Sequence, residues 1–352
     1  MSAPACLRPD VPGPTTFTVT ELGDRLVAKL DQNESAVDLP AELKARLAAE
    51  LAAAPWNRYP QPSAYVAARR ALAEALGLPP ECVALTVGGD QVIQAAFLLA
   101  GGAGRRARWF EPIYPYVPLA ARVTGTLADP VVLGEAVDQL DPAAIVRGQR
   151  ADLVVLVSPN NPTGGVVTDA TLEAALADDR RLVLLDEAYA DFADSPSRLT
   201  LATQRSNLMV GRSLSKSLCA GVRLGFAVAH PQIIATLERI YTAPYHLSAF
   251  QLLIAQHYGE ILPLVRASAA AVRTERARVL AALAARSGEG LRALPSQGNF
   301  VYFALPDAAA VHARLAARGI RVRNVSGLPG VHSALRVTIG TSEENDAFLA
   351  AL

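Results

Sequence analysis

The stretch Leu153-Val-Val-Leu-Val-Ser-Pro-Asn-Asn-Pro-Thr-Gly-Gly165 joins an unbroken apolar run to a loop rich in proline, asparagine and glycine. Because the run has no polar residue at alternate positions, it predicts a strand that is buried on both faces, as in parallel sheets. Similar runs predict strands at residues 83–87, 153–158, 182–186, 208–211 and 225–229. Helical patterns at 41–53, 63–76, 90–100, 169–177 and 232–241 alternate with them. The alternation predicts βαβ units, and therefore an α/β fold whose mostly parallel central sheet is flanked by helices.

The pattern changes after about residue 250. A long Ala/Arg-rich helix at 262–286 is followed by strands at 299–303, 320–323 and 334–339 and by a helix at 308–318. Thr341-Ser-Glu-Glu344 is a capping box that predicts the start of a final helix. We therefore expect a large domain over 41–250 and a smaller α+β domain over 251–352. Residues 1–40 are expected to form an N-terminal arm and part of the small domain.

Length and composition limit the possible domain organisation and the possible binding partners. The 352 residues exceed the ~250–300 residues of a usual single core. Lys+Arg and Asp+Glu both number 33, and this zero net charge argues against nucleic acid or an anionic membrane as the main partner. No apolar run reaches the ~18–20 residues that span a bilayer, and no signal peptide is evident. The three cysteines (Cys6, Cys82 and Cys219) and five histidines lack metal-ligand spacing. We expect a cytoplasmic protein that binds no metal.

Lysine is rare in this chain. Of its 33 basic residues only three are lysines, namely Lys29, Lys44 and Lys216. Lys29 and Lys44 have ordinary polar neighbours, whereas Lys216 lies in Ser213-Leu-Ser-Lys216, directly after an apolar run. A lysine can be deprotonated and can form a Schiff base, which arginine cannot do. Lys216 is therefore the candidate for covalent chemistry.

Polar residues follow two further predicted strands. Asp186 ends one apolar run, Tyr189 comes shortly after it, and Asn161 follows the run at 153–158. Because ligands bind beyond the carboxyl ends of parallel strands, these three side chains are expected to face one cleft. Simpler interpretations stay open, since Asp is common at helix N-caps and Asn-Pro is common in turns.

The remaining candidates suit an anion and a flat ring. Gly88, Gly89 and Asp90 follow a strand and open an apolar helix, where free N–H groups and the helix dipole favour a phosphate, although a plain turn also explains them. Ser213, Ser215 and Arg223 add two hydroxyls and a guanidinium near Lys216. Tyr114 lies in a proline-flanked segment that could present its ring to an aromatic ligand.

Together these residues supply what a pyridoxal phosphate site requires: a lysine, an acid for the ring nitrogen, donors for the ring oxygen, a phosphate pocket and an aromatic face. Their order along the chain resembles that of the fold-type I aminotransferases of class I/II. The resemblance covers nearly the whole chain and implies a fold-type I PLP-transferase, with a large cofactor domain and a smaller α+β domain.

Further segments resemble the histidinol-phosphate aminotransferases within that class. They are Leu30-Asp-Gln-Asn-Glu34, Asn57-Arg-Tyr-Pro60, Ala243-Pro-Tyr-His-Leu-Ser248, Gln297-Gly-Asn-Phe300, Val322-Arg323 and Leu335-Arg-Val-Thr-Ile-Gly-Thr-Ser-Glu-Glu-Asn345. The resemblance implies transamination of histidinol phosphate with 2-oxoglutarate or glutamate, as in histidine biosynthesis. The implied partners are a small-molecule amino donor and a 2-oxo acid.

The resemblance also implies residue roles. Lys216, Asp186 and Tyr189 would be catalytic, with Lys216 as the Schiff-base lysine and proton shuttle and Asp186 paired with the ring nitrogen. Asn161 and Tyr189 would bind the ring oxygen, and Tyr114 would stack on the ring. The phosphate would be held by Ser213, Ser215, Arg223 and the amides around Gly89 and Asp90. Tyr59 would reach the cofactor phosphate of a partner subunit, which implies a homodimer. Arg323, Arg336 and Asn33 would contact the substrate.

Two departures from the family pattern stand out. The loop from Lys216 to Arg223 is one residue shorter than usual in the family. No tyrosine occurs in the N-terminal segments Arg8-Pro-Asp10 and Thr15-Thr-Phe17, where the family often has one that helps to read the substrate. An aromatic amino-acid aminotransferase, a pyridoxal phosphate-dependent decarboxylase of a phosphorylated amino acid and a non-catalytic cofactor-binding regulator are the alternatives.

Overall fold

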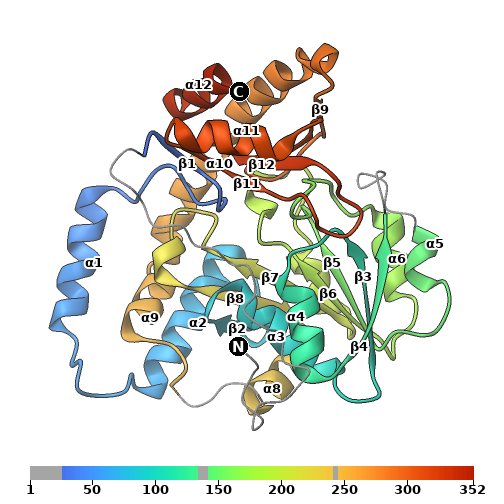
Figure 1. Cartoon of the computed structure of the whole chain (residues 1–352). Helices are drawn as coiled ribbons and strands as arrows, with labels where there is room; N and C mark the ends of the chain where they lie inside the picture. The colour runs from blue at the N-terminus through green and yellow to red at the C-terminus, as the bar shows by residue number, and fades with distance from the viewer. Residues whose placement is uncertain (1–25, 134–141, 241–244) are drawn as a thin grey trace, which may run out of the picture.

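The computed structural model describes residues 26–133, 142–240 and 245–352. Two sheets organise them, with the larger sheet below the smaller one in Figure 1. Cys6, the N-terminal segments that were compared with the family's tyrosine motif, Tyr241, Ala243 and Pro244 lie outside the described residues.

The larger sheet has seven strands in the order β2-β8-β7-β6-β5-β3-β4. They are β2 (Val83–Thr86), β3 (Arg106–Glu111), β4 (Leu127–Val132), β5 (Leu153–Val157), β6 (Leu182–Asp186), β7 (Leu208–Ser213) and β8 (Gly225–Ala229). Strand β8 pairs antiparallel with β2 and β7, and the other neighbours are parallel. The predicted α/β fold with a mostly parallel central sheet is confirmed.

Both faces of this sheet are covered by helices. Along β5, Val154 and Leu156 belong to one hydrophobic core, whereas Leu153 and Val155 belong to another. The first core receives α1 (Ala41–Ala53), α2 (Pro62–Leu76), α5 (Pro142–Val146), α6 (Asp169–Leu176), α7 (Leu199–Gln204) and α9 (Ala249–Gln256). The second receives α3 (Gly88–Ala100), α4 (Tyr116–Thr124) and α8 (Pro231–Ile240). Two-sided burial explains the unbroken apolar run of β5.

The smaller sheet has the order β1-β11-β12-β10-β9. Its strands are β1 (Ala28–Leu30), β9 (Arg292–Ala293), β10 (Phe300–Ala304), β11 (Ile320–Asn324) and β12 (Ala334–Thr338). Strand β1 pairs parallel with β11, and the other pairs are antiparallel. Its core also receives residues of α10 (Tyr258–Ala284), α11 (Ala308–Ala317) and α12 (Ser342–Ala351). The Thr341 side chain and the Glu344 side chain form the expected capping box of α12.

Helix α10 links the two cores. Ile261 and Val265 in its first half pack in the core of the seven-stranded sheet, whereas Val279 and Leu283 pack in that of the smaller sheet. Figure 1 shows the helix running from one layer to the other. The two sheets are therefore held by one continuous element.

Strands β3 and β4 of the larger sheet were not predicted from the sequence. The buried strand β3 contains Arg106, Arg108 and Glu111, which break its apolar pattern. Arg108 is tolerated there because its guanidinium pairs with Asp129 and donates to the carbonyls of Ile145, Arg147 and Gln149. Strand β4 is the exposed edge and carries Pro130.

Candidate functional site

The predicted site residues converge at the carboxyl ends of β5, β6 and β7, which are neighbours in the sheet. Lys216 lies in the loop after β7, and its Nζ donates to the carbonyl oxygen of Gln32 at 3.0 Å. The same Nζ lies 5.9 Å from the ring centroid of Tyr189. The N-terminal segment that contains Gln32 therefore reaches the lysine directly.

Asp186 ends β6 and is buried. Its Oδ1 accepts from the backbone N–H of Ala188 at 3.0 Å. Burial raises the pKa of the Asp186 carboxyl to about 7, and Asp90 and Glu187 add to this rise, while the Ala188 N–H and Lys216 oppose it. A cationic group placed beside this carboxyl would restore its ionised form.

Asn161 connects Tyr189 with the smaller sheet. Its Nδ2 donates to the Tyr189 hydroxyl at 3.3 Å, and its Oδ1 accepts from Arg336 Nη1 at 2.6 Å. All three side chains are buried. Arg336 lies on β12, so this chain of contacts joins the loops of the large sheet to a strand of the small one.

A second group of residues surrounds the start of α3. Arg223 Nη1 donates to Ser215 Oγ at 2.9 Å, and its Nη2 lies 3.5 Å from Asp90 Oδ2. Gly88 has φ +71°, and a Cβ there would lie 3.0 Å from Arg223 Nη2, so this close approach favours glycine. Arg223 itself adopts a left-handed conformation (φ 58°). The short Lys216–Arg223 loop therefore still places the guanidinium at the helix start.

Ser213, Gly89 and Tyr114 complete that group. A Cβ on Gly89 would lie 3.4 Å from Ser213 Cβ, so the two residues are in contact. Ser213 Oγ accepts from the Ser215 N–H at 3.2 Å, and the Tyr114 hydroxyl donates to Asp90 Oδ1 at 3.0 Å. Hydroxyls, a guanidinium and a helix N-terminus at one place form an arrangement that suits a phosphate.

Arg336 and Arg323 are direct neighbours on β12 and β11. Arg336 Nη2 donates to the Asp31 carbonyl at 2.7 Å, but its buried Nε has no partner among the described residues. Burial lowers the pKa of Arg336 to about 10, and the positive charge of Arg323 contributes to the same shift. The Arg323 side chain has no hydrogen bond or ion pair within the described part of the chain. Two adjacent cations with unused donors can hold an anionic group.

Two of the predicted residues, Asn33 and Tyr59, differ from the others in their surroundings. Asn33 is fully buried (0% exposed), and its side chain bonds Tyr189 and Thr338. Tyr59 lies between α1 and α2, is 71% exposed, and stacks on Tyr245 with ring centroids 4.5 Å apart. Among the described contacts of this chain, none joins Tyr59 to the residues around Lys216.

A network of charged and polar side chains next to this site was not predicted from the sequence. Arg212 is buried and pairs with Asp191 and, at 3.7 Å, with Glu187. Ser217 Oγ donates to Asp191 Oδ2 at 2.6 Å. Their position in the sequence could have identified two of these residues, because Glu187 directly follows Asp186 and Ser217 directly follows Lys216.

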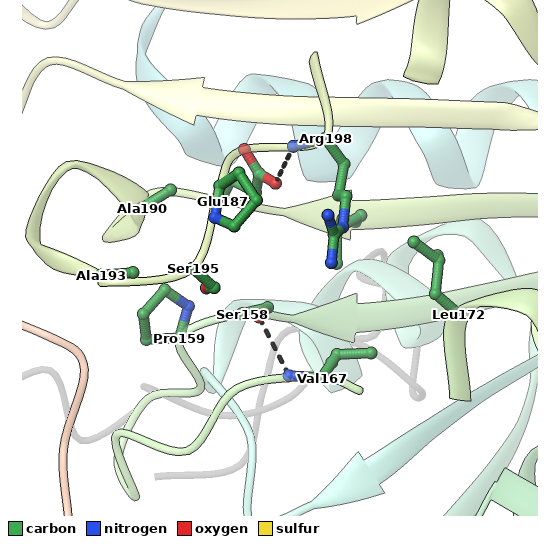
Figure 2. A pocket seen from close by; sticks show the side chains of 11 residues that line it. Ser158, Pro159, Val167, Leu172, Glu187, Ala190, Ala193, Ser195 and Arg198 are labelled. Carbon is green, nitrogen blue, oxygen red and sulfur yellow. Dashed lines mark hydrogen bonds between the residues drawn. The ribbon is translucent and has the colours of Figure 1, made fainter. Parts of the chain in front are cut away.

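Figure 2 shows a small pocket beside this network. Ser158, Glu187 and Arg198 are among the residues that line it. Glu187 Oε1 accepts from the Arg198 N–H at 2.7 Å, and Ser158 Oγ accepts from the Val167 N–H at 3.0 Å. Neither Lys216 nor Asp186 lines the pocket, so it is separate from the site described above.

Within the described ranges no helix is long and apolar enough to cross a membrane. In the same residues, no cluster of three or more histidine, cysteine, aspartate or glutamate side chains could hold a metal ion.

Solved structures of other proteins share this fold. The arrangement of the two sheets is that of the fold-type I aminotransferases. It is shared with a crystal structure of histidinol-phosphate aminotransferase from Sinorhizobium meliloti in complex with pyridoxal-5'-phosphate (TM-score 0.82, 23% identity, 100% of this chain and 98% of that chain). A putative aminotransferase from Burkholderia pseudomallei is also similar (TM-score 0.77, 28% identity, 92% of this chain and 96% of that chain).

Sequence comparison gives the family. Residues 26–352 match the model of aminotransferase class I and II, and the chain belongs to this family. It is 36% identical over 337 residues to a histidinol-phosphate aminotransferase of Chlorobium phaeovibrioides, covering 94% of this chain and 92% of the relative. The family predicted from the motifs is therefore confirmed.

Proposed function

We propose that this chain transfers an amino group between histidinol phosphate and 2-oxoglutarate, as in histidine biosynthesis. The observation that carries the proposal is the adjacent pair Arg323 and Arg336, which offers unused donors beside the Lys216 site. The similarity to relatives named histidinol-phosphate aminotransferase supports it.

The residues present fit pyridoxal 5'-phosphate. When bound, this cofactor supplies an electron sink that stabilises negative charge at the substrate carbon. Within the described residues the buried Asp186 carboxyl forms no ion pair, and the ring nitrogen would provide a cationic partner. The Tyr189 and Asn161 side chains would bind the ring oxygen, and Tyr114 would stack on the ring. The phosphate would lie among Ser213, Ser215, Arg223 and the amides at Gly89 and Asp90.

Lys216 would hold the cofactor covalently and then act as the base that moves a proton at the amine-bearing carbon of the substrate. Its contact with a backbone carbonyl, rather than with a carboxylate, leaves the Nζ unpaired with any charged group at hydrogen-bonding distance in the described structure. An amine in this setting is available for both tasks.

Arg336 would anchor the anionic group that both half-reactions share, and Arg323 would assist with the phosphate or the distal carboxylate. Histidinol phosphate carries a phosphate ester on a methylene group where an amino acid carries its α-carboxylate, so one anion pocket has to accept both. A guanidinium group can bind either a carboxylate or a phosphate in bidentate geometry.

The proposal extends to the molecule. The chain would act as a cytoplasmic homodimer, with Tyr59 reaching the cofactor phosphate of the partner subunit. Residues 41–250 would form the cofactor domain and residues 251–352 the smaller domain, while residues 1–40 would form an N-terminal arm and part of the smaller domain. The separate cores of the two sheets support two domains. Because Ile261 and Val265 pack in the core of the larger sheet, the boundary that these cores favour lies within α10 and not at residue 250.

Comparing kcat/KM for histidinol phosphate, histidinol and phenylalanine tests the function. Without its phosphate, the donor leaves buried charges unpaired, so histidinol should react ~10–100-fold more slowly. Arg323→Ala should weaken the reaction of histidinol phosphate more than that of phenylalanine. Faster turnover of phenylalanine or tyrosine by the wild type would replace the proposal with an aromatic amino-acid aminotransferase. Release of CO2 from a phosphorylated amino acid would indicate the decarboxylase instead.

A further inference from the structure

Three consecutive residues of the N-terminal segment each contact a different site residue. The Asp31 carbonyl accepts from Arg336 Nη2 at 2.7 Å, and the Gln32 carbonyl accepts from Lys216 Nζ at 3.0 Å. Asn33 contacts Tyr189 through its side chain, with Nδ2 donating to the hydroxyl at 3.1 Å. Only the last of these contacts uses a side chain of the segment, so only there does residue identity decide the contact.

Asn33 is itself held from the smaller sheet. Its backbone N–H donates to Thr338 Oγ1 at 3.0 Å, and its carbonyl accepts from Asn299 Nδ2 at 3.0 Å. Its backbone is left-handed (φ 55°), a conformation that Asn adopts more readily than most residues. Because the Thr338 hydroxyl donates to Asn33 Oδ1 at 3.0 Å, the amide is oriented with Nδ2 toward Tyr189.

Asn161 is oriented in the same way. Its Oδ1 accepts from Arg336 Nη1 at 2.6 Å, so its Nδ2 faces the Tyr189 hydroxyl at 3.3 Å. Rotating this amide by half a turn would place its NH2 group against the guanidinium, which can only donate. Both amides therefore donate to the same phenolic oxygen.

This arrangement fixes the role of the Tyr189 hydrogen. A phenolic hydroxyl has one hydrogen to donate and lone pairs that accept. With two amide N–H groups donating to the oxygen, the hydroxyl hydrogen has to point away from Asn33 and Asn161. Among the described residues no group accepts it.

We propose that Asn33 is a positioning residue, which acts through Tyr189 by making its hydroxyl an obligatory donor toward the ring oxygen of the cofactor. The inference rests on the proposed function for the cofactor, but not on the identity of the amino donor. It assigns Asn33 no contact with the substrate.

The charged and titratable groups near Tyr189 come from several elements. They are Asp186 from the end of β6, Lys216 from the loop after β7, Tyr114 from the loop after β3 and Arg336 from β12. All of them remain when Asn33 is changed, so a change at residue 33 isolates the donor to Tyr189.

The test is the pH midpoint of the visible absorption change of the holoenzyme. Negative charge on the ring oxygen holds the nearby proton whose loss this absorption change reports. A hydrogen bond donated to that oxygen reduces the charge, so a weakened donor raises the midpoint. Asn33→Gly fits the left-handed backbone and removes the amide, and it should raise the midpoint by about 1 pH unit and lower kcat about tenfold. Asn33→Asp keeps the shape but cannot donate, so it should shift the midpoint in the same direction even if the glycine variant folds poorly.

Two comparisons make the test specific. In a Tyr189→Phe background, Asn33→Gly should cause no further shift, because the group through which it acts is gone. Asn345→Ala removes another fully buried asparagine that contacts Gly340 and Glu275 instead, and it should lower stability without moving the midpoint. An unchanged midpoint in both Asn33 variants, or an equal shift with and without the Tyr189 hydroxyl, overturns the inference. Failure of the wild type to use histidinol phosphate would overturn the proposed substrate and leave this inference standing.

Discussion

Burial of the Asp186 carboxyl destabilises the folded, cofactor-free protein near neutral pH. The pKa of this carboxyl in the folded chain is about 7, whereas an unfolded aspartate titrates near ~3.9. Between these two values the folded state binds more protons than the unfolded state, so this group's contribution to stability falls as the pH rises from about 4 to 7.

The substitution Asp186→Asn removes this pH-dependent loss of stability. The cofactor-free variant should have a higher free energy of unfolding than the wild type at pH 8, by on the order of 2–4 kcal/mol, and nearly the same value at pH 4. Urea unfolding of both proteins at the two pH values measures the difference. A difference that does not depend on pH would show that the charge of Asp186 is not its source.

Lys216 is expected to be the residue that holds the cofactor, because the other two lysines are engaged in ion pairs with carboxylates. Lys29 pairs with Glu34, and Lys44 pairs with Asp38. Borohydride reduction of the holoenzyme followed by peptide mapping should place the pyridoxyl label on Lys216. Lys216→Ala should abolish the label and multiple turnover, while Lys29→Ala and Lys44→Ala should keep both. A label on either of those two lysines would refute the assignment.

The sequence indicated the residues at this site but not how they are connected. Lys216 stood out because lysine is rare, and Asn161 and Asp186 stood out because they follow apolar strands. The contacts of Asn33 with Thr338 and Tyr189 join residues 305 and 156 positions apart. No local pattern encodes such pairings, so Asn33 could be noticed in its motif while its hydrogen bonds with Tyr189 and Thr338 could not be predicted.

At the level of elements, the segments that follow β6 and β7 are joined by the buried Arg212 network. Arg212→Met would leave Glu187 and Asp191 without their buried cation, and removing one partner of a buried pair costs ~3–5 kcal/mol. We expect chemical unfolding to show a loss of that size.

Arg198→Met is the matched control for this change. Arg198 pairs with Asp169, whose side chain is 80% exposed, so its removal should cost only about 0–1 kcal/mol. Equal losses in the two variants would mean that the Arg212 pairs contribute no more than surface pairs do.

Strands that consist of unbroken apolar runs were predicted from the sequence, whereas a strand that contains charged residues was not. The runs of β5, β6 and β8 are uninterrupted and buried, and their positions were predicted within one or two residues. Strand β3 was missed because Arg108 lies inside it, and only the carbonyls and the carboxylate that surround its guanidinium make that burial favourable. Such compensation comes from distant segments, which a sequence window does not contain.

At the scale of the molecule, the site lies where the two sheets meet. The carboxyl ends of β5, β6 and β7, with the loops that follow them, supply Asn161, Asp186 and Lys216, and β12 of the other sheet supplies Arg336. Residues 31–33 form hydrogen bonds with Lys216, which follows a strand of the larger sheet, and with residues of β12 in the smaller sheet. The arrangement explains why the candidate residues are spread over most of the chain.

One exposed aromatic surface remains to be explained. Trp56 and Tyr59 are 76% and 71% exposed, and Tyr59 stacks on Tyr245, itself 46% exposed. Exposed apolar groups that gather in one place commonly mark an interface. In the proposed homodimer a partner subunit would cover this surface, and Tyr59 would complete the partner's site.

Mixed dimers test this arrangement. We expect Tyr59→Ala and Lys216→Ala each to be severely impaired alone. In a dimer formed by one copy of each, one site has the intact Lys216 of its own chain and the intact Tyr59 of the other. Random pairing makes about half of the dimers mixed, with one of their two sites intact, so co-expression should restore about a quarter of the wild-type activity.

The control pairs Lys216→Ala with Asp186→Ala. Both residues belong to the same chain's site, so every site in the mixed dimer carries one defect and activity should stay absent. Equal activity from the two co-expressions would contradict a site shared between chains, as would a fully active monomer in sedimentation analysis. If Tyr59→Ala alone keeps near-normal kcat/KM, the exposed aromatic surface serves a contact other than the one proposed.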